Sequence, residues 1–115
     1  MSRYNHLPIF QDVYKLTLEI YIATDKFPRK EKYSLGQKLK EITSSLLDLI
    51  IIANSKKDKV LTLEKAQLTL ERLQIHLRIA CDLKILGLKR FENFSRMIEN
   101  IRKEITGWKK WSKEN

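Results

Sequence analysis

The sequence has few of the residues that sharp turns and cross-links require. It contains three glycines, two prolines and one cysteine in 115 residues. So few turn-forming residues favour long helices over a sheet with many hairpins. The single cysteine, Cys81, excludes an intrachain disulfide framework and a zinc site built from cysteines. We therefore expect an all-α protein whose fold depends on side-chain packing alone.

A long apolar segment is also missing. The most apolar run, residues 46–53, contains Asp48 and is far too short to span a bilayer. No cleavable signal pattern precedes residue 15. We therefore predict a cytoplasmic protein with no membrane partner.

Residues that carry out catalysis or bind metals are scarce as well. His6 and His76 are the only histidines, and they lie far apart in the sequence. A di-iron bundle needs Glu-x-x-His on facing helices, and neither Glu64 nor Glu71 has a histidine three positions later. There is no glycine-rich phosphate loop. We predict a protein that is not an enzyme and that holds no metal and no cofactor.

Positive charge, by contrast, is abundant and unevenly distributed. The formal net charge is +9. Residues 28–59 and residues 88–115 each carry eight basic and four acidic side chains, whereas residues 1–27 carry three of each. A clustered basic excess is typical of a nucleic-acid-binding protein. It is also compatible with an acidic protein partner.

Helical periodicity predicts four helices in one domain that spans residues 1–115. The first is expected over residues 8–25, because the residue before Pro28 disfavours the helical conformation. The second begins between Pro28 and Ser34, where Ser34 and Gln37 have the spacing of a capping box. Short connections between four helices are typical of an up-and-down bundle.

The third helix is expected over residues 62–86. Thr62 is a plausible N-cap, and Gly87 is placed to end the helix. The fourth helix follows it. Each helix has an apolar stripe at intervals of three or four residues, as a core-facing helix should. These stripes are Ile9, Val13, Leu16, Ile20 and Ala23; Leu35, Leu39, Ile42, Leu46, Leu49 and Ala53; Leu63, Ala66, Leu70, Leu73, Leu77 and Ala80; and Phe91, Phe94, Ile98, Ile101, Ile105 and Trp108.

A second apolar set lies on the other side of the third helix. It comprises Leu68, Ile75, Ile79 and Leu86, and Ile75 is about 200° around the helix from Leu73. A four-helix monomer needs only one apolar stripe per helix. The second set therefore predicts an interface between subunits of a homo-oligomer. The alternative is a tightly buried central helix.

The fourth helix carries a basic row opposite its apolar stripe. Lys89, Arg96, Lys103 and Lys110 recur every seven residues. At 1.5 Å of rise per residue the row is about 30 Å long, which suits a polyanion. The alternative is an ordinary solvated helix face, in which each basic side chain pairs with a glutamate four residues earlier. These pairs would be Glu92 with Arg96 and Glu99 with Lys103.

The candidate nucleic-acid-binding residues extend beyond this row. Their expected role is contact with phosphates rather than reading of bases. Trp111 lies off the apolar stripe, where it could stack on a base or pack against a neighbouring subunit. The residues predicted to bind nucleic acid are Arg72, Arg78, Lys89, Arg96, Arg102, Lys103, Lys109 and Lys110.

Long segments of the chain resemble a known superfamily of four-helix bundles. "LPIFQDVYKLTLEIYIATDKFPRKEKYSLGQKLK" is similar to two of its branches. These are the accessory variability determinant (Avd) of diversity-generating retroelements and the protein encoded in intervening sequences of 23S ribosomal RNA genes. The second branch usually has an "NIAEG"-like stretch where this chain reads "LIIIANSKKDK". The C-terminal half, "RLQIHLRIACDLKILGLKRFENFSRMIENIRKEITGWKKW", resembles Avd more closely.

The resemblance to Avd implies a barrel-shaped homopentamer of basic four-helix subunits. It also implies binding to a reverse transcriptase and to nucleic acid, RNA or DNA, in support of mutagenic cDNA synthesis from a template RNA. Avd proteins are not themselves polymerases. The other branch leaves an alternative open, a helical protein-interaction module with no direct nucleic-acid binding.

Overall fold

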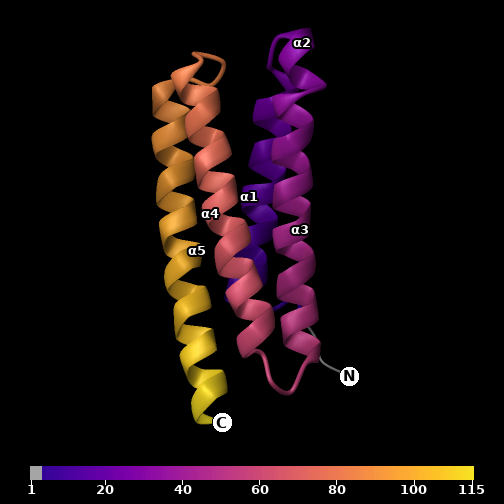
Figure 1. Cartoon of the computed structure of the whole chain (residues 1–115), viewed down its shortest axis with the longest axis vertical. Helices are drawn as coiled ribbons and strands as arrows, with labels where there is room; N and C mark the ends of the chain where they lie inside the picture. The colour runs from indigo at the N-terminus through magenta and orange to yellow at the C-terminus, as the bar shows by residue number, and fades with distance from the viewer. Residues whose placement is uncertain (1–3) are drawn as a thin grey trace.

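Four long helices run up and down along one axis in the computed structural model, which describes residues 4–115 (Figure 1). A single short helical turn, α2, joins the first two, and the described residues contain no strand. The all-α bundle predicted from the sequence is therefore confirmed. The elements are α1 (Pro8–Asp25), α2 (Arg29–Lys32), α3 (Leu35–Ser55), α4 (Val60–Asp82) and α5 (Leu88–Glu114).

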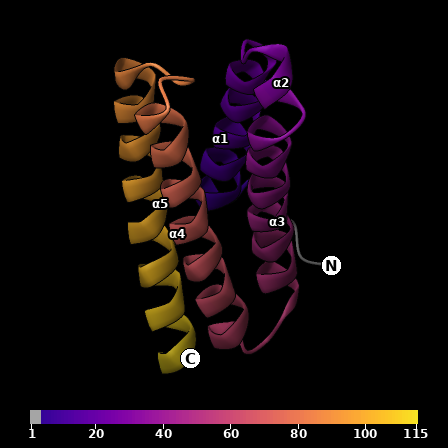
Figure 2. The same ribbon diagram turned by 45° about the horizontal axis from the view of Figure 1, so that its top comes forward.

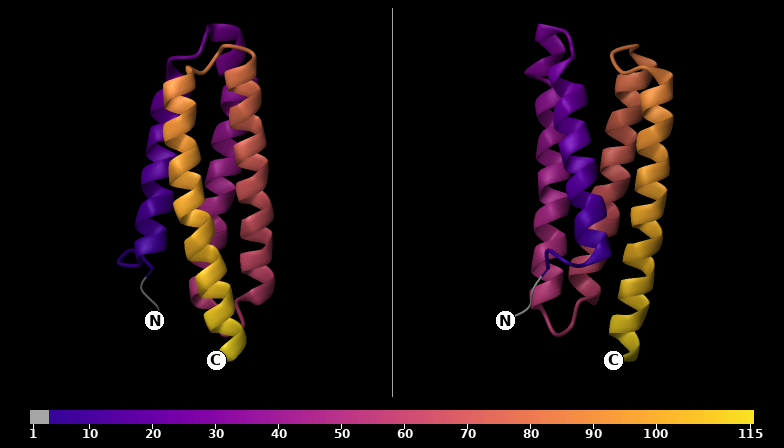
Figure 3. Two further views of the ribbon diagram at one scale, coloured as in Figure 1. Left: turned by 90° about the vertical axis from the view of Figure 1, so that its left-hand side faces the viewer. Right: turned by 180° about the vertical axis from the view of Figure 1, so that it is seen from behind.

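Each long helix contributes one apolar stripe to a common core. Helix α3 packs against α1 and α4, and α5 packs against α4 and α1. The views from the side and from behind show the four helices enclosing this core (Figure 3). Every residue of the stripes predicted on α1 and α4 is buried. On α3, Ile50 is fully buried while Leu49 is only partly so, and on α5 the two ends of the stripe, Phe91 and Trp108, are partly buried.

The connection between α1 and α3 differs from the predicted capping box. The Oγ of Ser34 donates a hydrogen bond to the carbonyl oxygen of Lys30 at 3.1 Å and makes no capping bond to α3. The backbone at the start of α3 instead packs closely against the preceding turn. A Cβ on Gly36 would lie 3.3 Å from the carbonyl oxygen of Glu31 and 3.5 Å from the ring of Phe27. Glycine thus lets the first turn of α3 approach the preceding turn.

Helix α4 begins and ends earlier than the sequence predicted. It starts at Val60, whose backbone N–H donates to the carboxylate of Asp58 at 3.1 Å, and Thr62 is buried inside the helix instead of capping it. It ends at Asp82, and Gly87 does not terminate it; Gly87 precedes α5 as an extended N-cap residue.

The turn after α4 is a Schellman motif without glycine. The N–H of Ile85 donates to the carbonyl of Ala80 at 2.9 Å, and the N–H of Lys84 donates to that of Cys81 at 2.9 Å. Lys84 occupies the left-handed region with φ of 63°. This turn folds Leu86 back into the core, where it is 4% exposed. The prediction that Leu86 lies on a subunit interface is therefore wrong.

Replacing Lys84 by glycine is expected to stabilise the protein by about 1 kcal/mol, because glycine adopts the left-handed conformation without a Cβ clash. Chemical denaturation at one protein concentration measures this difference. Lys84→Ala is the matched control, since it removes the same exposed side chain but keeps the Cβ. Equal stability of the two variants would contradict the strain at this position.

Candidate nucleic-acid interface

The basic row predicted on the last helix is exposed along its whole length. Lys89, Arg96, Lys103 and Lys110 all lie on the outward side of α5, away from its buried stripe. Within residues 4–115, none of the four belongs to an ion pair. We call these four residues the α5 row. Their charges are available to a ligand that approaches α5 from solvent.

The ion pairs expected of an ordinary solvated face are not formed. Glu92 makes no ion pair with Arg96, and Glu99 makes none with Lys103, in the part of the chain that the structure describes. Glu99 pairs instead with Arg102, three residues further along α5. The carboxylates of α5 therefore leave the α5 row uncompensated.

Arg102 and Lys109 lie on a different flank of α5, facing α4. The guanidinium of Arg102 bonds to the carboxylate of Glu71 at 2.6 and 3.1 Å and also pairs with Glu99. The hydrogen bond to Glu71 raises the pKa of Arg102, although partial burial opposes it. Lys109 donates to the side-chain oxygen of Gln67 on α4 at 3.0 Å. These two side chains therefore link α5 to α4. The periodicity of the last helix could not reveal this link, because the partners of both side chains are on α4.

Arg72 and Arg78 lie on the exposed surface of α4 and not beside the α5 row. Arg72 lines a shallow groove with Lys38 and Glu41 of α3. The Nε of Arg78 lies 3.8 Å from a carboxylate oxygen of Asp82, one turn later on α4, and both side chains are largely exposed. The eight predicted residues thus form three groups: four on the α5 row, two between α4 and α5, and two on α4.

An apolar stripe follows the outer surface of α4. Leu68 is 66% exposed and Ile75 is 52% exposed, and Ile79 is exposed beside them. Leu61 is also exposed and was missed by the sequence analysis, although it lies seven residues before Leu68. We call these four residues the α4 outer stripe. Four exposed aliphatic side chains aligned on one side of a helix are unusual for a monomer surface.

Comparison of the sequence with models of protein families identifies the family of this chain. A family model described as bAvd-like matches residues 7–112, which includes α1, α3, α4, all but the last two residues of α5, and the entire α5 row. The chain belongs to the bAvd-like family. A comparison with curated proteins gives no match. The resemblance to Avd seen in the sequence is thereby confirmed.

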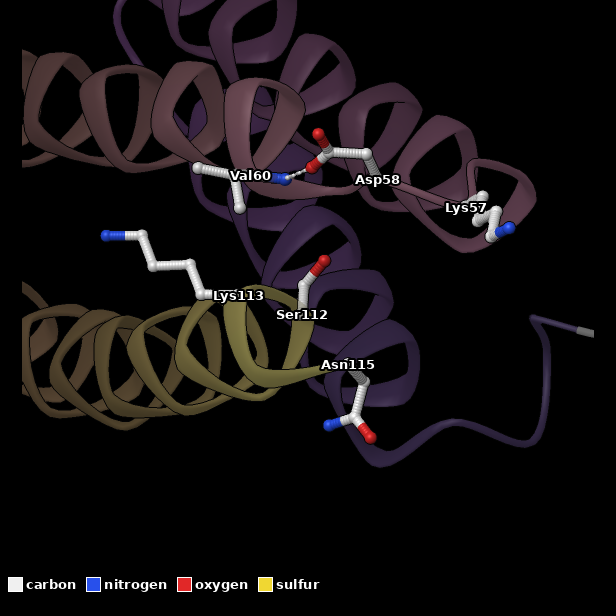
Figure 4. A pocket seen from close by; sticks show the side chains of 6 residues that line it. All are labelled: Lys57, Asp58, Val60, Ser112, Lys113 and Asn115. Atoms are coloured by element: carbon white, nitrogen blue, oxygen red, sulfur yellow. Dashed lines mark hydrogen bonds between the residues drawn. The ribbon is translucent and has the colours of Figure 1, made fainter.

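The bAvd-like chain carries further lysines where the α3–α4 loop meets the end of α5. A groove there is lined by Lys57, Asp58, Ser112 and Lys113, among others, and the two lysines lie on either side of Ser112 (Figure 4). The ammonium group of Lys59, in contrast, hydrogen-bonds within the protein. Its Nζ donates to the carbonyl of residue 53 at the end of α3 at 2.9 Å, and burial lowers its pKa. Lys57 and Lys113, which are exposed and form no ion pair among the described residues, extend positive charge beyond the α5 row.

Acidic groups of the bAvd-like bundle meet between α1 and α5. The amide of Asn100 donates to Asp12 at 3.1 Å and to Glu104 at 3.5 Å. Partial burial, followed by the hydrogen bond and charge of Asp12, raises the pKa of Glu104 to about 7. Protonated Glu104 therefore favours the folded state at low pH. This stabilisation is lost as the pH rises from its ordinary pKa of 4.5 toward about 7.

Glu104→Gln is expected to stabilise the protein at pH 8 and to change little at pH 5. The glutamine removes the charge that faces Asp12 but keeps a group able to hydrogen-bond. With a discount for solvent screening at this partly exposed site, the gain at pH 8 is about 1 kcal/mol. Denaturation at the two pH values measures it. Equal effects at both pH values would exclude titration of Glu104 as the cause.

Residues 4–115 contain neither a metal-binding cluster nor a membrane-spanning helix. No group of three or more histidine, cysteine or acidic side chains there is arranged to hold a metal ion. None of the helices in this range is long and apolar enough to cross a membrane.

Proposed function

We propose that this bAvd-like protein is a non-enzymatic accessory protein of a diversity-generating retroelement. In this role it binds nucleic acid, template RNA or cDNA, beside the element's reverse transcriptase. The observation that carries the proposal is the α5 row, four exposed basic side chains that form no ion pair with any residue from 4 to 115. Membership of the bAvd-like family supplies the biological setting.

The spacing of the α5 row suits a phosphate backbone. Successive members are seven residues apart, which is about 10.5 Å along a helix. That distance is about three times the 3.4 Å rise per nucleotide of one DNA strand. Contacts to phosphates position a nucleic acid without reading its sequence. Such binding suits an accessory protein whose ligand changes in sequence.

Self-association through the α4 outer stripe is the second part of the proposal. On α4, this stripe lies between Glu71, which faces α5, and Arg72, which faces α3. Packing Leu68, Ile75 and their neighbours between subunits would remove this apolar surface from water. Arg72 would then lie at the rim of the interface. The family resemblance implies five subunits.

Light scattering on the purified chain, alone and with a short RNA, tests the proposal. We expect a closed oligomer whose mass increases when RNA is added at low salt and returns toward its initial value at moderate salt. A monomer that is indifferent to RNA would overturn both parts.

A protein-interaction module with no direct nucleic-acid binding is the alternative. The charges of Arg102 and Lys109 favour it, because carboxylates and an amide of the bundle itself already engage them. In that case the α5 row would grip an acidic face of a partner protein. This alternative predicts an oligomer with no salt-sensitive affinity for RNA or DNA alone.

A further inference from the structure

Gly107 is an exposed glycine inside α5 that the chain does not need for its own packing. Glycine in a helix interior is less favourable than alanine. One use of glycine is to let another group approach the backbone closely. At Gly107, however, a Cβ would meet nothing within 4 Å in the described chain. The space beside this backbone is therefore open to a partner.

Trp111 lies one helical turn after Gly107 on the same side of α5. Side chains four residues apart are neighbours on a helix, and they lean toward its N-terminus. The Cα–Cβ bond of Trp111 consequently leans toward the turn that contains Gly107. Trp111 is 52% exposed, whereas Trp108 packs against the core and has the Nζ of Lys59 5.5 Å from its ring centre.

Two members of the α5 row bracket the bare backbone. Lys103 precedes Gly107 by four residues, and Lys110 follows it by three. Residues at these intervals are neighbours on a helix surface. Both lysines are exposed, and neither belongs to an ion pair within residues 4–115. Around the helix axis, Gly107 therefore lies between the exposed ring of Trp111 on one side and the two unpaired cations on the other.

We propose that Trp111 and Gly107 form a stacking site for an unpaired base, with Lys103 and Lys110 on the adjoining phosphates. The inference rests on the proposed function and deepens it, because it assigns a single-stranded ligand to this end of the α5 row. A base in a duplex is already stacked between its neighbours, but a single-stranded base offers its face to an aromatic side chain. The missing Cβ leaves room for the base to reach the indole.

Binding of the full chain to a single-stranded RNA and to a DNA duplex with an equal number of phosphates tests this site. We expect Trp111→Ala to weaken RNA binding about 5-fold or more, because one stacking contact is lost. Duplex binding should be almost unchanged. Trp111→Phe should retain most of the affinity for RNA. Tyr33→Ala, which removes an aromatic ring exposed near α2, is the matched control and should alter neither ligand.

Gly107→Ala separates binding from stability. The added methyl group improves helix propensity, so the unfolding midpoint should rise by about 2–5 °C. The same methyl group enters the space proposed for the base, so RNA binding should weaken. In a Trp108→Phe background, fluorescence reports on Trp111 alone, and single-stranded RNA should quench it.

The outcomes distinguish this inference from the proposed function. Unchanged RNA binding by Trp111→Ala, with strong binding by the wild type, would overturn the stacking site and leave the α5 row standing. A change in oligomer mass on Trp111→Ala would make Trp111 a subunit contact and also overturn the site. A wild-type chain that binds neither ligand at low salt would overturn the proposed function as well.

Discussion

Arg96→Glu combined with Lys103→Glu is expected to weaken nucleic-acid binding on the order of 100-fold at low salt, because two phosphate contacts become repulsive. Neither side chain belongs to an ion pair within residues 4–115, so the substitutions break no salt bridge of the bundle. The new carboxylates meet other acidic groups on α5, which costs only a few tenths of a kcal/mol per like-charge pair. Helix content and subunit number should therefore remain unchanged.

The salt dependence of binding gives a second measure of the same double variant. Each phosphate that the protein neutralises contributes about 0.7 to 0.9 to the slope of log affinity against log salt. Removing two contacts should reduce the slope by about 1.4 to 1.8. Titrations of a labelled RNA at four or five salt concentrations determine this slope. An unchanged slope would mean that neither side chain contacts a phosphate.

The matched control changes the same net charge at another place. Lys30→Glu with Lys38→Glu alters exposed residues of α2 and α3, which lie away from α5 (Figure 2). This variant should lose much less affinity than the α5 variant. If both variants lose affinity equally, binding follows the net charge of +9 and not the α5 row.

The core and the exposed faces were predictable because burial imposes a strong period on a helix. Val13 and Leu16 on α1, and Leu70 and Leu73 on α4, are buried as their spacing predicted. A single polar residue at such a position would lose several favourable contacts, so the pattern is nearly complete in the sequence.

Helix ends were predicted less well because their determinants are local and replaceable. The turn after α4 places Lys84 in a conformation that usually selects glycine. Because Gly87 was available as a terminating residue, the sequence predicted that this helix continues to residue 86. That prediction placed Leu86 on the outer side of the helix, away from the core. The helix stops at Asp82, and the turn returns Leu86 to the core.

The candidate site was only partly predictable because charge pairing depends on neighbouring helices. The seven-residue spacing of Lys103 and Lys110 was sufficient to place both on one exposed surface. Arg102 adjoins Lys103 in the sequence, yet it faces Glu71 on α4. Which of two adjacent basic residues remains unpaired is decided by the packing of α4 on α5.

Leu68→Asp combined with Ile75→Asp is expected to dissociate the proposed oligomer into monomers. Burying one such aliphatic side chain is worth about 1.5–3 kcal/mol. Both side chains of every subunit would lose that gain, and a carboxylate buried at the interface adds a desolvation penalty. Association should therefore weaken by more than about 1,000-fold. Both residues are exposed in the subunit, so its helices should remain intact.

Light scattering at several protein concentrations measures this dissociation. The control is Ile52→Asp with Leu88→Asp, which places the same charges at exposed aliphatic residues of α3 and α5. It should keep the wild-type mass, and an unchanged mass for the α4 variant would exclude the α4 outer stripe as the interface.

The monomeric variant would still carry the α5 row. It should bind a long RNA more weakly than the oligomer, because linked sites gain affinity from their high effective concentration. The monomeric variant and the wild-type protein should bind equally to an RNA that is too short to contact more than one subunit. Comparing the long and the short RNA would separate the contribution of assembly to affinity from that of the α5 row.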